Sequence, residues 1–158
     1  MRTLWSFVHL LGVSGLLLFH GVQIWALFSL APAFPDRERI FDRAEQSRMA
    51  TMPMYVSLAI LVVGGVAAGI ERSWFSRGWW LWTSIVVLLA TIGAMAGMAT
   101  PFMRKVREAT TRWADGSYPM NDADLEALLR GPMTRVIAGT GSTGLLLILW
   151  LMVAKPGA

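Results

Sequence analysis

The only two histidines of the chain, His9 and His20, lie eleven residues apart in the uncharged stretch FVHLLGVSGLLLFH. On an α-helix this separation is about 20° more than three full turns, so both rings share one face, about 16 Å apart along the axis. Gly12 and Gln23 lie on the same face. Imidazole nitrogens bind haem iron and other transition metals. These four residues are therefore the candidate cofactor-binding residues, and His9 and His20 are the candidate metal ligands.

Three interpretations of this face stay open. In the first, each histidine is neutral and hydrogen-bonded to a hydroxyl or carbonyl group of another helix. In the second, at least one histidine ligates the iron of haem b, with His9 as the first candidate, His20 as the second, and Gly12 leaving room for a flat ring. In the third, the histidines bind copper together with methionines, because thioethers suit Cu(I). The methionines considered are Met52, Met54, Met95 and Met98.

The elements that position these side chains follow from the distribution of charge. The chain has 158 residues and is 55% hydrophobic but only 15% charged, whereas a soluble domain carries roughly 25% charged residues. Four uncharged runs are each close to or above the roughly 20 residues that a membrane-spanning helix needs. We therefore predict a single, all-α integral membrane domain over residues 1–158, an up-down antiparallel four-helix bundle in a lipid bilayer. The expected spans are residues 4–30, 53–70, 79–103 and 134–153.

The basic residues predict an orientation for these four spans. Ten of the 14 Lys and Arg residues fall in the first and third connections, and four fall at the termini and in the second connection. Lys and Arg favour the cytoplasmic side. We therefore expect a bacterial inner-membrane protein with both termini in the periplasm and a longer cytoplasmic loop between the third and fourth helices.

Missing residue types exclude several classes of function. The chain has no cysteine, which removes disulfides and thiolate chemistry. Apart from Arg135 at the boundary of the fourth, the four spans contain no Asp, Glu, Lys or Arg, and pumps, ion-coupled transporters and intramembrane hydrolases normally depend on such groups. No nucleophile–base pair or phosphate-binding loop is visible, and whether the protein is an enzyme stays open. The net charge of +4 reflects orientation in the membrane and does not indicate a nucleic-acid partner.

The connections between the spans contain further helix signals. The segment DRERIFDRAEQSRM fits either a short helix on the membrane surface or a continuation of the second span, and Pro53 suits the first turn of that span. The start of the third connection extends the third helix. DADLEALLR then predicts a short helix, with Asn121 or Asp122 as its cap.

Glycines recur at the four-residue spacing that lets membrane helices pack closely. Such pairs are Gly65 with Gly69 and Gly93 with Gly97, and the fourth span contains GTGSTG. These faces fit packing inside one bundle. They also fit contact with a flat cofactor, with a second copy of the chain, or with a larger membrane complex.

Several segments in order carry a family resemblance. They are the histidine of the first helix, the run RAEQSRMATMPMYVSLAILVVGG, the tryptophan-led GWWLWTSIVVLL and the terminal LWLMVAKPGA. Together they resemble bacterial four-helix integral membrane proteins of unknown function and, more distantly, HemJ-type protoporphyrinogen oxidases and copper-resistance D-like proteins. The HemJ-type resemblance implies haem at His9. Thr83 stands where that family carries a functional lysine, which argues against protoporphyrinogen oxidation.

The sequence thus leads to two expectations about function. The first is a haem-associated membrane protein, in electron transfer or haem handling, with His9 as the iron ligand. The second is a non-catalytic accessory subunit that packs against a larger respiratory or photosynthetic membrane complex. Copper binding or transport is a third possibility.

Overall fold

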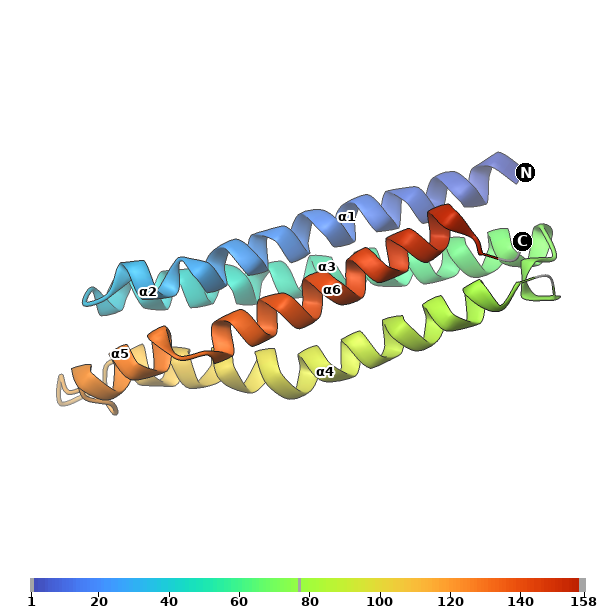
Figure 1. Ribbon diagram of the computed structural model, residues 1–158. Coiled ribbons are helices and arrows are strands. Elements are labelled where there is room, and N and C mark those ends of the chain that lie inside the picture. The colour runs from blue at the N-terminus through green and yellow to red at the C-terminus, as the bar shows by residue number, and fades with distance from the viewer. Residues whose placement is uncertain (1, 77, 157–158) are drawn as a thin grey trace.

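The computed structural model describes residues 2–76 and 78–156, and these residues are almost entirely helical (Figure 1). Arg77, which the orientation argument places in the second connection, lies outside the described residues, as do Met1 and residues 157–158 of the expected domain. The elements are α1 (Arg2–Phe28), α2 (Leu30–Ala33), α3 (Arg37–Glu71), the 3₁₀ helix η1 (Trp74–Ser76), α4 (Trp79–Thr110), α5 (Asp122–Arg130) and α6 (Met133–Ala154).

Four helices are long and apolar enough to cross a membrane, which confirms the predicted all-α fold and a multi-pass membrane protein. They carry many large apolar side chains on their outer faces, such as Phe7, Leu18, Val86 and Leu146, each more than 60% exposed. A soluble protein rarely exposes so much contiguous apolar surface, and a bilayer would cover it. Figure 1 shows the N- and C-terminal ends at the same end of the bundle, which we call the η1 end, with α2 and α5 at the other, the α5 end.

Helix α3 decides between the two interpretations of the first connection. The charged segment continues the second span, because α3 begins at Arg37 after the cap residue Asp36, whose carboxylate accepts from Arg39 N (3.0 Å). The inner face of this extension is buried at Ile40, Ala44, Ser47 and Ala50, so packing against the bundle holds it in the helix. Pro53 consequently lies inside α3, and its expected first-turn position was wrong. Proline is tolerated inside membrane helices when neighbouring groups satisfy the freed carbonyl.

The other helix ends differ less from their expected positions. Helix α1 ends at Phe28, and the short helix α2, which contains Pro32, follows it. Helix α4 continues to Thr110, as the expected extension of the third span predicts. Helix α5 is capped by Asn121, whose side-chain oxygen accepts from Asp124 N (2.8 Å). Of the two proposed caps, the asparagine is confirmed.

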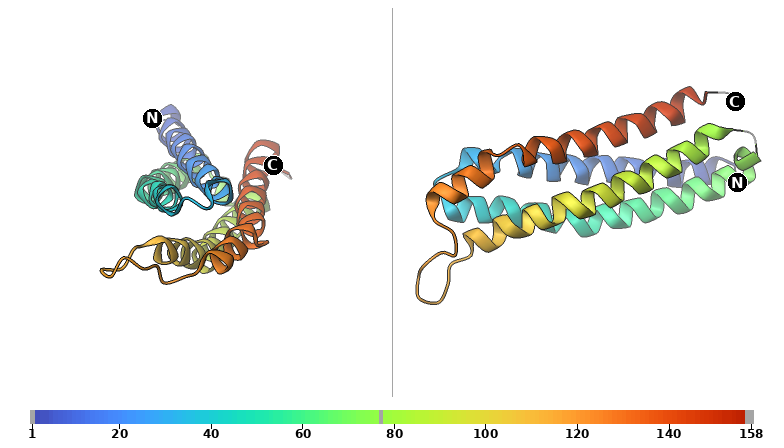
Figure 2. Two further views of the ribbon diagram at one scale, coloured as in Figure 1. Left: turned by 90° about the vertical axis from the view of Figure 1, so that its left-hand side faces the viewer. Right: turned by 60° about the horizontal axis from the view of Figure 1, so that its bottom comes forward.

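The bundle is built from two helix pairs (Figure 2, left). In the first pair, the backbones of α1 and α3 are in contact at glycines. A Cβ atom on Gly64 would lie 2.5 Å from His9 N, and a Cβ atom on Gly12 would overlap the backbone of Leu61. In the second pair, a Cβ atom on Gly144 of α6 would overlap Thr91 of α4. Small residues thus permit close packing within each pair, while contact between the pairs is less extensive.

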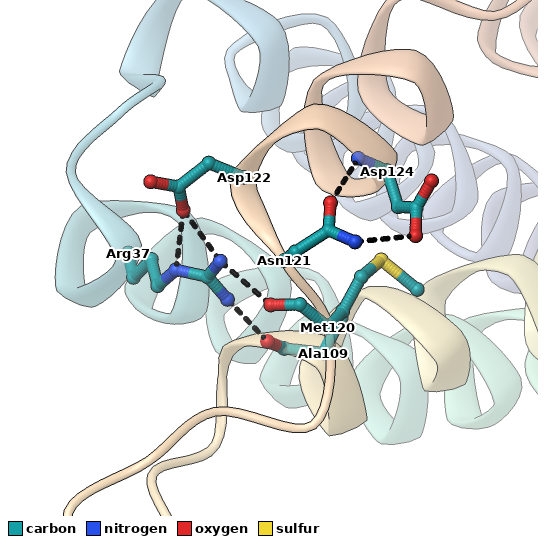
Figure 3. A network of polar contacts seen from close by, with 6 residues as sticks. All are labelled: Arg37, Ala109, Met120, Asn121, Asp122 and Asp124. Atoms are coloured by element: carbon teal, nitrogen blue, oxygen red, sulfur yellow. Dashed lines mark hydrogen bonds and ion pairs between the residues drawn. The ribbon is translucent and has the colours of Figure 1, made fainter.

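The α5 end closes the bundle with a buried apolar cluster and one arginine. The cluster joins α1, α2, α3, α4, α5 and α6, and includes Ile40, Val106 and Leu125, none of which is exposed. Figure 3 shows the arginine, Arg37, donating to Ala109 O (2.9 Å), Met120 O (2.7 Å) and Asp122 Oδ1 (2.6 Å). Its side chain is only 10% exposed. It therefore ties the start of α3 to the end of α4 and the start of α5.

Candidate functional site

A cavity of about 530 Å³ lies between the two helix pairs. It is partly open and mostly apolar, and its size is within the roughly 300–1,000 Å³ of small-molecule sites. Helix α1 contributes Leu16, His20 and Gln23, and α6 contributes Gly141 and Leu145. Helix α3 contributes Ser47, Arg48, Thr51, Met52, Met54, Tyr55 and Leu58. Helix α4 contributes Leu88, Thr91, Ile92, Met95, Ala96, Ala99, Thr100, Met103 and Arg107.

His20 is a buried polar residue of this cavity. It is 9% exposed, and its Nε2 atom is fully buried without a hydrogen-bond partner. The Cε1–Nε2 bond of the ring faces Gly141, because a Cβ atom there would lie 2.9 Å from Cε1 and 3.1 Å from Nε2. The same point is 3.4 Å from Met95 Sδ. The imidazole and the thioether therefore both pack against Gly141, and a side chain at that position would displace the ring.

A second, smaller cavity of about 30 Å³ adjoins His20. Its wall includes Gln23, Met95 and Met103, together with apolar side chains of α1 and α6. A volume above roughly 10–15 Å³ holds one water-sized particle. This space is therefore large enough for a single small particle and far too small for a ring.

Gln23, expected beside the histidines, is held in place by the neighbouring helix. Its Nε2 atom donates to Thr51 Oγ1 (3.1 Å), and that hydroxyl donates in turn to Ser47 O (3.0 Å). This chain of bonds orients the amide on the cavity wall and links α1 to α3. The structure thus brings His20 and Gln23 together in one site.

Arg48 and Arg107 line the cavity from α3 and α4, in the part of each helix nearer the α5 end. Arg48 forms an ion pair with Glu45 of its own helix, and Glu45 also interacts electrostatically with Arg107. Two guanidinium groups and one carboxylate leave an excess of positive charge there. An acidic group on a ligand would meet favourable electrostatics at this position.

His9 and Gly12 lie outside the cavity, in the interface between α1 and α3. His9 Nδ1 donates to Leu61 O (2.8 Å), and its ring packs against Gly65, where a Cβ atom would be 2.8 Å from Nδ1. For His9 the geometry matches the hydrogen bond of the first interpretation, which joins the imidazole to a carbonyl group of another helix. The space beside Gly12 is filled by the backbone of Leu61, so no flat ring fits there.

The methionines considered for copper separate into three groups. Met95 lies beside His20, Met52 and Met54 line the larger cavity, and Met98 lines neither cavity and packs against the apolar cluster of the α5 end. Met103 lines both cavities, and the sequence reasoning missed it, as it missed Gly141 and the two arginines. Met95 and Met103 are eight residues apart, about 80° around the helix axis, which is within the width of one broad helix face. That spacing is a signal that could have found Met103.

The donor types limit the chemistry of the site. Within residues 2–76 and 78–156, no three His, Cys, Asp or Glu side chains gather as a metal site, and the cavity walls named above carry no carboxylate. Comparisons with protein-family models, with curated proteins and with solved structures find no match to this chain. The site can therefore be interpreted only from its own residues. These residues offer apolar walls, hydroxyl and amide groups, two guanidinium groups and one unpartnered imidazole nitrogen.

Proposed function

We propose that this protein binds a lipid-soluble, amphipathic molecule with an apolar body and an acidic head group, in the cavity between its two helix pairs. The observation that carries the proposal is the cavity itself, about 530 Å³ and partly open, with apolar walls and with Arg48 and Arg107 toward one end. Its shape and chemistry suit a molecule that enters from the bilayer and places its acid group near the arginines.

Haem b, the cofactor expected from the sequence, belongs to this class because its ring is apolar and its propionates are acidic. His9 is not positioned to ligate the iron of a haem bound in the cavity, because His9 lies outside the cavity. His20 lines the cavity, but its Nε2 atom is fully buried against Gly141. With the side chains in these positions, His20 Nε2 does not fit as the axial ligand of a haem bound in the cavity.

The proposal is tested on the full chain, extracted from membranes in a mild detergent. Native mass spectrometry is expected to find a co-purifying amphipathic acid. Titrations are expected to show that oleate or haemin binds about tenfold or more weakly to Arg107→Gln than to the wild-type chain, because a charge-assisted bond is lost. Arg104→Gln is the matched control, since Arg104 is exposed on the same helix outside the cavity. Failure of the wild-type chain to bind either probe, or equal binding by both variants, would refute the proposal.

Absorption spectra separate haem from other members of the class. A Soret band that is lost in His20→Leu and kept in His9→Leu would place haem in the cavity after a rearrangement of the ring. A band that is lost in His9→Leu alone would instead support the ligand expected from the sequence, at a site outside the cavity. Oleate binding without any Soret band would assign the cavity to a lipid-like acid.

We further propose that the four helices cross a bacterial inner membrane alternately, with both termini in the periplasm. The ten basic residues of the first and third connections support this orientation. The chain contains no cysteine, so single cysteines report cleanly on topology. A membrane-impermeant maleimide added to intact spheroplasts is expected to label Ser76→Cys and to label Asp115→Cys only after permeabilisation. The reverse pattern would invert the orientation.

A second candidate function is the accessory subunit expected from the sequence. The observation that favours it is on α4, where Cβ atoms on Gly93 and Gly97 would meet nothing within 4 Å. Another membrane helix could pack closely against such a face. A specific co-purifying chain should be lost in Gly97→Ile. It should be kept in Gly139→Ile, which alters an equally open glycine of α6.

A further inference from the structure

We infer that His20, Met95 and Met103 form a binding site for one soft monovalent cation, Cu(I) or Ag(I), at the inner wall of the cavity. This site is independent of the proposed amphipathic ligand, because it lies around the smaller space of about 30 Å³ that the three side chains share. A cation at this position needs neither Arg48 nor Arg107.

The first argument is the state of His20 Nε2. A buried polar atom without a partner costs about 1–3 kcal/mol, and folded proteins rarely keep one without a reason. The atom is fully buried, and the residue is 9% exposed. A neutral imidazole that carries its proton on Nδ1 presents a lone pair at Nε2, which is the form that binds metals. A cation would satisfy this nitrogen.

The second argument is the position of the sulfur atoms. His20 Nε2 and Met95 Sδ lie 3.1 Å and 3.4 Å from the position of a Cβ atom on Gly141, so the two donor groups are neighbours. For comparison, zinc bonds to imidazole nitrogen and to thiolate sulfur are about 2.0 Å and 2.3 Å long. These bonds are shorter than the roughly 2.8 Å of a hydrogen-bonded water, so a bare ion needs less room than water does. Met103 lines the smaller cavity together with His20 and Met95, and it supplies a second thioether there.

The third argument is the identity of the donors. One imidazole and two thioethers form a soft ligand set, which selects Cu(I) over Mg²⁺, Ca²⁺ or Mn²⁺. The lining residues of the smaller cavity carry no carboxylate, so nothing there favours a hard or doubly charged ion. Gly141 has a defined part in this arrangement, because a Cβ atom there would lie 2.9 Å from His20 Cε1 and would displace the ring.

The test uses Ag(I), a redox-inert probe, with the full chain in detergent and a chloride-free buffer. We expect one equivalent to bind by calorimetry and native mass spectrometry, with nitrogen and sulfur neighbours in X-ray absorption spectra. Met95→Leu and Met103→Leu conserve volume and remove sulfur. Each should weaken binding by more than about 100-fold, because loss of even an outer-shell partner costs 10–100-fold. Met98→Leu, on the same helix but outside both cavities, should leave binding unchanged.

A matched glycine pair tests the geometry with every donor retained. Gly141→Ala should weaken binding strongly, since the new methyl group would lie 2.9 Å from His20 Cε1 and displace the ring, whereas Gly139→Ala should not, since nothing lies within 4 Å of that position. Circular dichroism and gel filtration check that each variant folds. The inference is overturned if the wild-type chain binds no Ag(I), if Met95→Leu binds as wild type, or if Met98→Leu and Gly139→Ala lose binding equally. Met95→Leu leaves Arg48 and Arg107 in place. A result that overturns the cation site is therefore distinguishable from a result that refutes binding of the amphipathic ligand.

Discussion

The two histidines of α1 share one helix face but lie in two different kinds of interface. His9 lies between α1 and α3, where glycines bring the backbones into contact and Leu61 O accepts its Nδ1–H at 2.8 Å. His20 lies between the two helix pairs, where its Nε2 atom has no partner and cavities remain. In the closely packed α1–α3 pair, the imidazole of His9 forms a hydrogen bond between the two helices. In the looser junction between the pairs, His20 Nε2 has no partner, and the candidate site lies there.

The largest expected effect comes from disturbing the close interface. In Gly12→Ala the added Cβ atom meets the backbone of Leu61, which cannot move aside as a side chain can. Overpacking costs about 1–3 kcal/mol and sometimes more, and we expect about 3 kcal/mol or more here. Thermal unfolding in detergent, followed by circular dichroism, measures the loss. Gly21→Ala on the same helix meets nothing within 4 Å and should be neutral, so equal unfolding temperatures for the two variants would contradict the close contact.

The second-largest loss of stability is expected at the α5 end, which holds the two helix pairs together at one end of the bundle. Arg37→Gln removes donors from two carbonyl groups and from Asp122. We expect a loss of about 2 kcal/mol, discounted because Asp122 is 70% exposed. Limited trypsin digestion at Arg112, in the segment that this arginine anchors, should become faster. Arg39→Gln is the control, because Arg39 is exposed and its ion pair with Asp36 of the helix cap lies on the surface. Equal digestion rates would show that the arginine does not anchor the segment.

The helices can be predicted well from the sequence, because a long uncharged run is visible along the chain without knowledge of its neighbours. Long uncharged runs must be helical in a bilayer, since every backbone polar group needs an internal partner. The α1 face that carries both histidines also follows from spacing alone. Which helix meets that face does not, because helices of similar composition can pair in several ways. The separation of His9 from His20 therefore depends on the glycines of α3 and α6, which the sequence shows but does not assign to a neighbour.

The same reasoning explains the errors. Pro53 looks like a helix start because proline suits a first turn, but burial of Ile40 and Ala44 extends α3 past it. Gly12 looks like space for a ring because nothing in the sequence shows that Leu61 fills it. Met103 is overlooked because a methionine near a helix end is most often packing. In each case a contact between distant segments overrides a local signal.

A smaller effect sharpens the comparison at His9. His9→Leu removes the hydrogen bond to Leu61 O and leaves that carbonyl without its side-chain partner. Hydrogen bonds between membrane helices contribute about 0.6 kcal/mol on average and at most about 1.7 kcal/mol. We expect a loss of about 1 kcal/mol in unfolding experiments in detergent. No loss at all would mean that glycine packing alone holds the α1–α3 pair.

The smallest effect is expected at His20. His20→Leu replaces a buried, unpartnered ring nitrogen with an apolar group of similar size. Because no bond is lost and a polar atom leaves a buried position, the variant should be as stable as the wild-type chain, or more stable by up to about 1 kcal/mol. Ag(I) should reverse this order, since a ligand that binds only the folded wild-type chain stabilises it by mass action. Unfolding of both proteins with and without Ag(I) measures the reversal. A metal-free His20→Leu variant that unfolds as readily as His9→Leu would mean that the two imidazoles hold the bundle together alike.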